Sequence, residues 1–491
     1  MTAPNRATLW GRTLVDELAK SGVTAAVVSP GSRSTPLTVA LAEHDDIETF
    51  SVLDERSAAF FALGRGRRTG EPTALVCTSG TAAANYHPAV IEASQSRVPL
   101  LVCTADRPAE LTDSGANQTV DQTKLYGDAV RWYKTLPEPA PEPRRLRSLR
   151  VAADRAVAKT TGANPGPVHL NVPVAKPLEP TEQPGDVPES LAGEAPLAVE
   201  GRDGPFVRTT AGTLEPDEAA VADIAADLAS ADRGLVVAGP LNPGVCDPGA
   251  VDELLGATGV PLLADPLAGL RFGSLAADRP VFGGYDSYLD APGWPDPEVV
   301  VRIGASPTSK VLRRFLAEAD ARQVVVDPAG EWPEAEFTAT DYLEADPGAT
   351  VRALAERVDD GTGAGEPATE EHPTDDAVEW RRRFERAEAT HWELVDEAVA
   401  TASEGRPLEG AVLSEVVAGA PDPGTVFVSN SMPVRDCDRF GQPRSADLTV
   451  LGNRGASGID GITSTALGAG SATDEPLVLV TGDLAYYHDT N

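Results

Sequence analysis

The chain has 491 residues, enough for about three domains of ordinary size. Acidic residues outnumber basic ones by 75 to 41, which gives a formal net charge of −34. A field this negative repels nucleic acid and anionic membranes, so we expect neither as a partner. The acids are spread along the whole chain, which predicts a solvated acidic surface suited to high salt. An ordinary acidic cytosolic protein is the alternative.

The four cysteines are far apart and match no disulfide or zinc spacing. Two of them, Cys77 and Cys103, lie inside apolar runs and are expected to be buried thiols. The first residues lack the basic and then apolar pattern of a signal peptide. No run approaches the roughly 18 apolar residues that a membrane span needs. We therefore expect a soluble, reduced protein of the cytoplasm with no membrane insertion.

Short apolar runs alternate with helical patterns over residues 1–180. The pattern predicts helices over 57–68 and 82–94. It predicts buried strands at 25–30, 49–54, 73–80, 99–108 and 167–173. This alternation is typical of a parallel sheet with helices on both faces.

Two further α/β domains are predicted, at 206–358 and 377–491, after linkers at 181–205 and 359–376 that are rich in Pro, Gly and acids. A long charged helix is expected from about Val378. The predicted strands are 234–240, 260–266, 299–306 and 323–328 in the second domain, and 425–431, 448–453 and 476–483 in the third. The fold class is thus α/β, with three doubly wound parallel-sheet domains, the third incomplete.

Ligands of open parallel sheets bind outside the carboxyl ends of the strands, and polar motifs gather at those ends here. They read "SPGSRSTPL" (29–37), "TSGTAAANYHPAVIEA" (78–93), "TADRPAEL" (104–111), "GANQ" (115–118), "NSMPVRD" (430–436) and "NRGASGIDG" (453–461). No G-x-G-x-x-G fingerprint and no P-loop motif occurs in the sequence. Nicotinamide-dependent and P-loop functions are therefore disfavoured.

These six motifs, in this order, resemble the 2-succinyl-5-enolpyruvyl-6-hydroxy-3-cyclohexene-1-carboxylate synthases of menaquinone biosynthesis, which depend on thiamin diphosphate. The resemblance implies a pyrimidine-binding domain at 1–180, a central domain at 206–358 and a diphosphate- and metal-binding domain at 377–491. It implies a transferase that joins 2-oxoglutarate to isochorismate with loss of CO2. It also implies a homodimer or dimer of dimers that needs Mg²⁺ or Mn²⁺. In the family's reaction the cofactor attacks the keto carbon, and the decarboxylated product adds to isochorismate.

Glu55 follows a predicted strand and opens a predicted helix. An acid in the first turn of a helix is favoured by the helix dipole alone, which is the structural alternative. The resemblance implies instead that Glu55 hydrogen-bonds the cofactor's aminopyrimidine ring and activates the cofactor by proton transfer.

Both expected substrates are dicarboxylates, and the matched motifs contain four arginines that suit bidentate carboxylate binding. For any one of them alone, a surface ion pair is the alternative. The resemblance implies that isochorismate contacts Ser32, Arg33, Arg107 and Gln118. It implies that the oxoglutarate part contacts Ser431, Arg435 and Arg454, with Lys310 as a further substrate-side residue.

The resemblance also assigns cofactor-binding residues. They are Glu55, Ser79, Gly80, Thr81, Asn430, Ile459, Gly482 and Asp483. Ile459 matches the bulky residue that props the cofactor into a bent form. Asp483 matches a metal ligand, although an aspartate that caps a helix N-terminus is the alternative.

The last apolar run, "LVLVTGD", reads as a central strand that needs neighbours on both sides. We therefore expect the chain as given to be a fragment of a longer enzyme, poorly soluble or partly disordered after about residue 425, and inactive by itself. Two other functions stay open: another thiamin carboligase of the acetolactate-synthase type, and a non-catalytic cofactor-binding protein.

The net charge of −34 predicts a salt requirement. Acidic residues repel one another in dilute buffer, and the Debye length falls from about 10 Å at 0.1 M to about 3 Å at 1 M salt. The midpoint of urea unfolding should therefore rise as KCl is increased towards molar concentrations. A midpoint that is independent of KCl would contradict this expectation.

Overall fold

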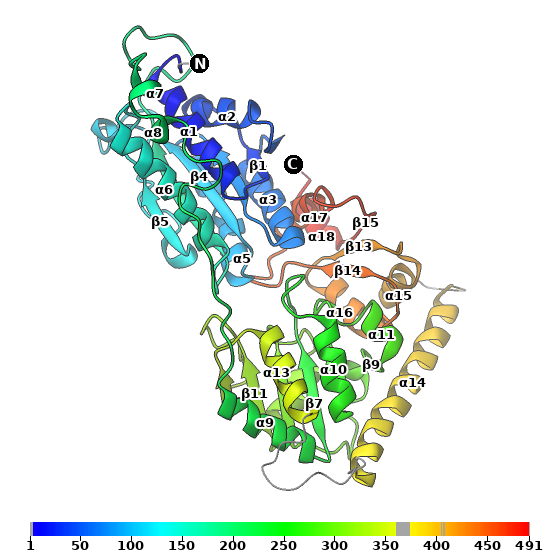
Figure 1. Ribbon diagram of the computed structural model, residues 1–491. Helices are drawn as coiled ribbons and strands as arrows, with labels where there is room; N and C mark the ends of the chain where they lie inside the picture. Colours follow the sequence, from blue (N-terminus) through cyan, green and yellow to red (C-terminus); the bar gives the residue numbers. More distant parts are fainter. Residues whose placement is uncertain (1–2, 360–373, 404, 406–407, 491) are drawn as a thin grey trace. The chain divides into compact units, whose positions relative to one another are not determined.

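The computed structural model describes residues 3–359, 374–403, 405 and 408–490. The chain folds into α/β layers around three parallel sheets (Figure 1). Residue contacts divide it into two compact units. Unit 1 comprises Met1–Ala211, Asn453–Asp474 and Asp483–Asn491, and unit 2 comprises Gly212–Gly452 and Glu475–Gly482. The "NRGASGIDG" motif belongs to unit 1 because it lies in the segment Asn453–Asp474.

The sheet of unit 1 has six parallel strands in the order β2-β1-β3-β4-β6-β5. The strands are β1 (Ala25–Val28), β2 (Glu48–Ser51), β3 (Thr73–Cys77), β4 (Leu100–Asp106), β5 (Trp132–Thr135) and β6 (Pro167–Pro173). Five of them were predicted, whereas β5 was not. The thiols of Cys77 and Cys103 are buried in this sheet, as expected.

Alternating side chains of these strands enter two apolar layers, because successive residues of a strand point to opposite faces. One face packs against α1 (Arg6–Lys20), α2 (Thr35–Ala42) and α6 (Pro143–Thr160). The other packs against α3 (Glu55–Thr69), α4 (Thr81–Asn85) and α5 (His87–Gln95). Both layers can be followed in Figure 1.

Two local predictions differ from the structure of unit 1. The helix expected over 82–94 is divided at Tyr86, and Pro88 lies in the first turn of α5, where a missing backbone N–H costs nothing. The segment 181–205, expected to be a linker, contains α7 (Leu191–Glu194) and α8 (Pro196–Val199). Leu191 and Ala198 enter the core, so this part of the segment is packed structure.

The larger sheet of unit 2 is also parallel, in the order β12-β11-β10-β7-β8-β9. Its strands are β7 (Gly234–Ala238), β8 (Leu262–Ala264), β9 (Val281–Phe282), β10 (Val299–Ile303), β11 (Arg322–Val326) and β12 (Asp341–Leu343). One face packs against α9 (Glu218–Ser230), α10 (Pro248–Thr258), α11 (Ser274–Asp278) and α13 (Pro347–Asp359). The other carries α12 (Lys310–Glu318) and the start of α14 (Asp375–Ser403).

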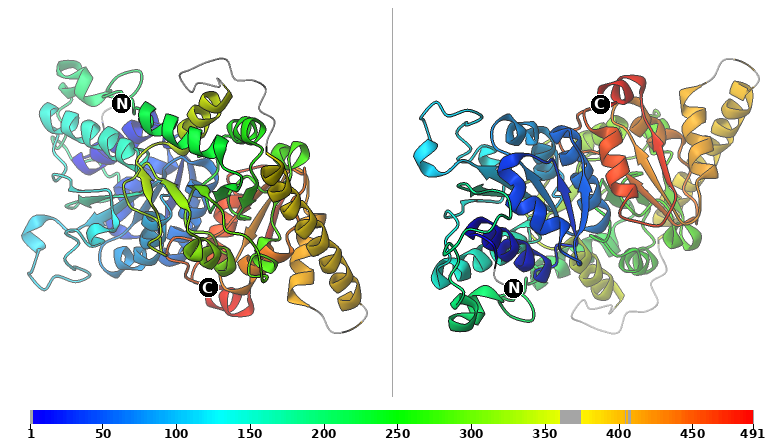
Figure 2. Two further views of the ribbon diagram at one scale, coloured as in Figure 1. Left: turned by 90° about the horizontal axis from the view of Figure 1, so that it is seen from below. Right: turned by 90° about the horizontal axis from the view of Figure 1, so that it is seen from above.

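Helix α14 is the long yellow helix of Figures 1 and 2 and confirms the charged helix expected from about Val378. It begins at Asp375, and Trp380 and Phe384 pack on the sheet face. Neither α14 nor any other helix in the described part of the chain is long and apolar enough to cross a membrane.

The third sheet holds β13 (Gly424–Val428), β14 (Leu448–Leu451) and β15 (Leu477–Val480), in the order β14-β13-β15. Helices α15 (Glu409–Gly419) and α16 (Met432–Phe440) pack on it through one apolar cluster. Strand β15 pairs with β13, and its four residues are half-buried. The remaining helices, α17 (Ile462–Gly470) and α18 (Asp483–His488), belong to unit 1.

A fully buried cation joins the two sheets of unit 2. The Arg271 Nε donates to the Ala264 carbonyl, and its Nη2 donates to Asp438 Oδ1 at 2.8 Å. The Tyr285 hydroxyl donates to the same Asp438 oxygen at 2.8 Å. Because Asp438 lies on α16, this network ties α16 to the central sheet. The "NSMPVRD" motif at the start of α16 is thereby held in place.

In unit 1, α3 and α17 touch backbone to backbone. A Cβ added at Gly64 would overlap the carbonyl oxygen of Thr465, and one added at Gly468 would overlap that of Phe61. Only glycine permits this approach, since any side chain would force the helices apart.

Replacing Gly64 by Ala should therefore destabilise the protein by about 1–3 kcal/mol through overpacking. Urea unfolding would measure the effect. The control is Gly193→Ala in α7, where an added Cβ meets nothing within 4 Å. The contact is unimportant if both variants unfold at the wild-type midpoint.

Candidate functional site

The order of the strands in unit 1 reverses between β1 and β3. At such a point, loops that leave neighbouring strands diverge to opposite faces and open a crevice where ligands bind. The "SPGSRS" motif follows β1 and the "TSGT" motif follows β3. The "DRP" motif follows β4, the next strand. Three predicted motifs thus meet at one edge of the sheet.

Two arginines are held at this edge. Arg33 lies in the 3-10 turn Ser32–Ser34, is buried, and donates from Nη1 to the Val174 carbonyl at 2.6 Å. Arg107 donates from Nη2 to the Asn117 carbonyl at 2.9 Å. The Nε atoms of both arginines are buried and have no hydrogen-bond partner among the described residues.

The two guanidinium groups are close enough to affect each other. The pKa of Arg33 is lowered by burial first and then by the positive charge of Arg107, while Asp106 opposes both effects. Asp106 is itself anchored by hydrogen bonds from Asn171 Nδ2 and from the Arg107 backbone N–H, each at 2.7 Å. Two cations with unused donors beside the Asp106 carboxylate can form a site for an anion.

The loop after β3 is tied to the segment 115–122. Gln118 donates from Nε2 to the Ser79 carbonyl at 3.0 Å, and the Ser79 hydroxyl donates to the Gln118 carbonyl at 3.1 Å. Gly80 has φ +92°, and a Cβ there would lie 3.1 Å from Gln118 Cγ. Of the predicted residues nearby, Ser79 and Gly80 are buried, whereas Ser32 and Thr81 are exposed.

Gln122 is a positioning residue that the sequence did not reveal. Its Oε1 accepts from the Gly80 N–H at 2.9 Å, and its Nε2 donates to Asn171 Oδ1 at 2.8 Å. Gln122 is buried and therefore connects the "TSGT" loop with the Asn171–Asp106 pair. The "GANQ" motif ends four residues earlier, so only its spacing to Gln122 could have drawn attention to it.

The same network ends at a buried histidine. The Thr104 hydroxyl donates to Asn171 Oδ1 at 2.9 Å and lies 2.7 Å from His169 Nε2. Since that hydroxyl donates to Asn171, it accepts from His169, which places a proton on Nε2. Burial lowers the pKa of His169 to about 3.

Glu55 is half-buried at the first position of α3, with Asp54 as the N-cap. Its Oε2 accepts one long hydrogen bond, from Asn85 Nδ2 at 3.4 Å. The carboxylate can therefore accept a further donor.

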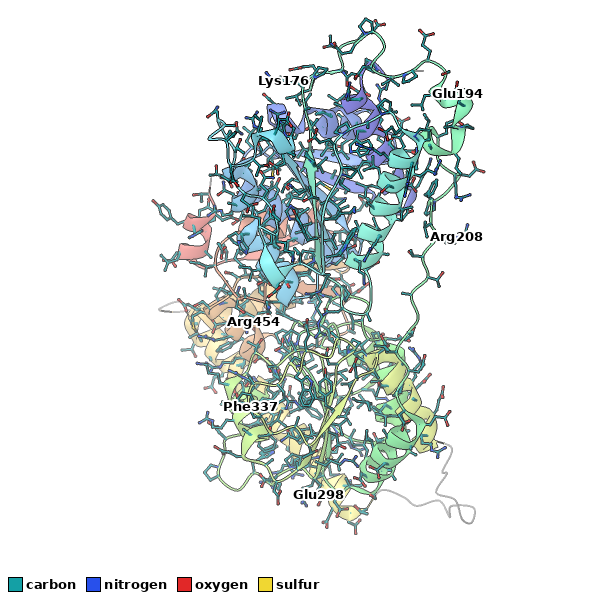
Figure 3. The ribbon with its side chains drawn as sticks, turned by 90° about the vertical axis from the view of Figure 1, so that its left-hand side faces the viewer. Lys176, Glu194, Arg208, Glu298, Phe337 and Arg454 are labelled. Carbon is teal, nitrogen blue, oxygen red and sulfur yellow. The ribbon has the colours of Figure 1, made fainter. Side chains whose placement is uncertain are left out.

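Three further predicted residues lie in the later segments of unit 1. Arg454, labelled in Figure 3, and Ile459 are half-buried on the connection from β14 to α17. Asp483 is exposed at the first position of α18, and its Oδ1 accepts from the Leu484 N–H at 2.8 Å. No group of three or more His, Cys, Asp or Glu side chains that could hold a metal occurs in the described ranges. A single exposed carboxylate nevertheless suits Mg²⁺, which takes one or two carboxylates together with phosphate oxygens.

The other predicted residues belong to unit 2. Asn430 and Ser431 follow β13, and Arg435 lies one turn into α16. Ser431 has φ +73° and ψ −120° at the N-cap, a conformation that non-glycine residues rarely adopt. Ser431 and Arg435 are exposed, and Asn430 is buried. Gly482 follows β15, and Lys310 is exposed at the start of α12, beyond the end of β10 on the other sheet of this unit.

Comparison with known proteins identifies the family. Residues 10–125 match the model "Thiamine pyrophosphate enzyme, N-terminal TPP binding domain". The chain is similar to the 2-succinyl-5-enolpyruvyl-6-hydroxy-3-cyclohexene-1-carboxylate synthase of Haloarcula marismortui, at 63% identity over 500 residues, which is 100% of this chain and 81% of the relative. The chain belongs to this synthase family.

Two more distant members give the same result. The synthase of Natronomonas pharaonis is 57% identical over 499 residues and covers 100% of this chain and 81% of its own length. The synthase of Roseiflexus castenholzii is 44% identical over 493 residues, which is 99% of this chain and 81% of the relative. The chain is thus a transferase of the thiamin-diphosphate type, and its three parallel α/β sheets fit that fold.

Because the buried His169 stays neutral in the folded protein, we expect the free energy of unfolding to decrease at acidic pH. The unfolded chain protonates this histidine near pH 6.5, whereas the folded protein keeps it neutral to about pH 3. The free energy of unfolding should therefore fall as the pH drops below 6.5, by about 1.4 kcal/mol per pH unit from this group. Urea unfolding between pH 7 and 4 would measure the slope.

His169→Gln keeps a donor to Thr104 and should remove this part of the slope. Thr104→Val is the control, because it keeps the buried imidazole and should retain the slope at a lower overall stability. Equal acid slopes for the wild type and His169→Gln would show that His169 is not responsible.

Proposed function

We propose that the chain joins 2-oxoglutarate to isochorismate with loss of CO2, forming 2-succinyl-5-enolpyruvyl-6-hydroxy-3-cyclohexene-1-carboxylate. Membership of the synthase family supports the reaction. The observation that carries the substrate class is the Arg33–Arg107 pair with its unused buried donors at the switch point. A site of this kind is costly to build unless it binds anionic groups.

Bound thiamin diphosphate would supply the nucleophilic carbon and take up the electron pair left by CO2. The residues proposed to hold it are Glu55, Ser79, Gly80, Thr81, Asn430, Ile459 and Gly482. Glu55 would hold and move the proton that the aminopyrimidine ring exchanges, because its carboxylate lies at a helix start and can accept another donor. Asp483 is the proposed ligand for Mg²⁺ or Mn²⁺.

Substrate recognition divides between two sets of residues. Ser32, Arg33, Arg107 and Gln118 are proposed to bind the carboxylates and hydroxyl of isochorismate. Ser431, Arg435, Arg454 and Lys310 are proposed to bind the oxoglutarate part. In a chain of net charge −34, local pairs of arginines are needed to attract a dicarboxylate.

Another thiamin carboligase would bind substrates with fewer carboxylates, and the Arg33–Arg107 pair disfavours it. A non-catalytic cofactor-binding protein would bind thiamin diphosphate without consuming 2-oxoglutarate. Measurement of CO2 release with and without isochorismate separates these alternatives.

We also propose a homodimer or dimer of dimers in the cytoplasm, with an acidic surface suited to high salt. Several large apolar side chains of unit 1 are exposed, which favours association. They include Leu53 at 80%, Leu467 at 56% and Tyr487 at 80% exposure.

The test combines two kinds of variant. Glu55→Gln should lower kcat by about 10²–10⁴-fold while thiamin diphosphate still binds, because it removes proton transfer. Glu218→Gln is the matched control, since Glu218 also opens a helix behind an aspartate N-cap. Arg107→Ala should raise the KM for isochorismate and leave release of CO2 from 2-oxoglutarate largely intact, whereas Arg435→Ala should do the reverse.

Near-normal turnover of Glu55→Gln would exclude its proposed role. Loss of CO2 release in Arg107→Ala with an unchanged KM for isochorismate would reverse the assignment of the two arginine sets.

A further inference from the structure

The connection from β14 to α17 in unit 1 is built around the carboxylate of a glutamate on α5. Glu92 Oε1 accepts from the Gly455 N–H at 2.9 Å. Its Oε2 accepts from the N–H groups of Ala456 at 2.7 Å and Ser457 at 3.2 Å. Three successive backbone donors thus converge on one side chain, an arrangement that binds anions.

This carboxylate is buried and has a cationic partner. Glu92 is 3% exposed, and Arg67 on α3 donates from Nη2 to its Oε1 at 3.1 Å. The same Nη2 lies 2.8 Å from the Ser96 hydroxyl, which in turn donates to the Glu92 carbonyl at 2.6 Å. The carboxylate is therefore fixed from the side of α3 and offers its remaining acceptor positions to the loop.

The loop backbone is shaped to meet Glu92. A Cβ at Gly455 would come within 2.7 Å of the Glu92 carbonyl oxygen and 2.8 Å of the Ser96 nitrogen, so only glycine fits there. Ser457 has φ +60°, which costs energy for a residue with a side chain. Such a conformation persists where hydrogen bonds compensate for it.

The loop also borders a cavity. Ala456 and Gly458 line a cavity of about 480 Å³ together with Glu92, Phe60 and His87. The hydrogen bonds to Glu92 thus hold loop backbone that borders open space.

We propose that Glu92 is a positioning residue of the synthase reaction that sets the placement of Arg454 and Ile459. Arg454 directly precedes the first amide that Glu92 holds, and Ile459 follows the last by two residues. The inference rests on the proposed function, in which Arg454 binds the oxoglutarate part and Ile459 supports the cofactor. Misplacement of a binding group by about 1 Å can cost on the order of 100-fold in rate.

The test is Glu92→Gln in the full chain. The new amide group keeps one acceptor but presents N–H groups to the backbone donors of the loop. The KM for 2-oxoglutarate should rise about tenfold or more, with a much smaller change in the KM for isochorismate. Hydrogen exchange of the amides of residues 455–457 should accelerate.

Glu17→Gln is the matched control. Glu17 is also a buried glutamate of unit 1 that accepts from an arginine, Arg150 at 2.6 Å, and from a backbone amide, Phe206 at 2.5 Å. This variant should lose stability without changing the ratio of the two KM values. If Glu92→Gln folds poorly because Arg67 is left buried alone, the double variant Arg67→Leu/Glu92→Gln removes both charges and should show the same ratio.

A Glu92→Gln variant with wild-type exchange at 455–457 or with an unchanged KM ratio would overturn the proposal. An equal shift of the ratio in Glu17→Gln would also overturn it. A wild-type protein that does not consume 2-oxoglutarate would refute the proposed function instead, and the exchange of 455–457 would still decide whether Glu92 holds the loop.

Discussion

The burial of Arg33 beside a second cation, Arg107, is the constraint on which the polar edge of unit 1 depends. Burial and the charge of Arg107 both lower the pKa of Arg33, so the surrounding structure must hold this guanidinium group in place. The sheet does so because the loops after β1 and β4 leave from the same edge. Carbonyl groups of Val174 and Asn117 each fix one guanidinium group. In the proposed function, an anionic ligand bound there would offset the positive charge of both arginines.

Behind this edge, a chain of hydrogen bonds between buried polar groups continues into the interior of unit 1. The chain from Gly80 through Gln122, Asn171 and Thr104 to His169 satisfies each group in turn. Only the His169 Nδ1 lacks a partner within this chain of groups. A network satisfied in this way rigidifies the loops that it contacts. In unit 2, the seven donor contacts of Arg271 serve a comparable purpose for α16.

Among the described strands, the sequence predicted every central one but missed three of the six at the sheet edges. Strands β5, β9 and β12 were missed, and each is the last strand at one end of its sheet. An edge strand is covered on fewer sides, so "WYKT" and "DYL" carry no continuous apolar run. The break at Tyr86 was missed because "AAANYHPAV" keeps a helical apolar pattern across it.

For the candidate site, motifs located the arginines and the "TSGT" loop, because these residues adjoin predicted strand ends. Gln122, His169 and Glu92 adjoin no predicted strand end, although Glu92 lies within the "TSGTAAANYHPAVIEA" motif and His169 within a predicted strand. Each acts through hydrogen bonds to backbone or side-chain groups far away in sequence, as Glu92 does to residues more than 360 positions later. A single sequence does not encode such partners in any local pattern.

The contact between α3 and α17 has a mechanical consequence. Glycine against backbone leaves no layer of side chains that could change rotamer and absorb a displacement. We therefore expect α3 and α17 to move together as one rigid pair of helices. One begins at Glu55, and the other begins three residues after Ile459. A displacement of Glu55 at the start of α3 should therefore displace the start of α17 as well, although the two positions lie about 400 residues apart in sequence.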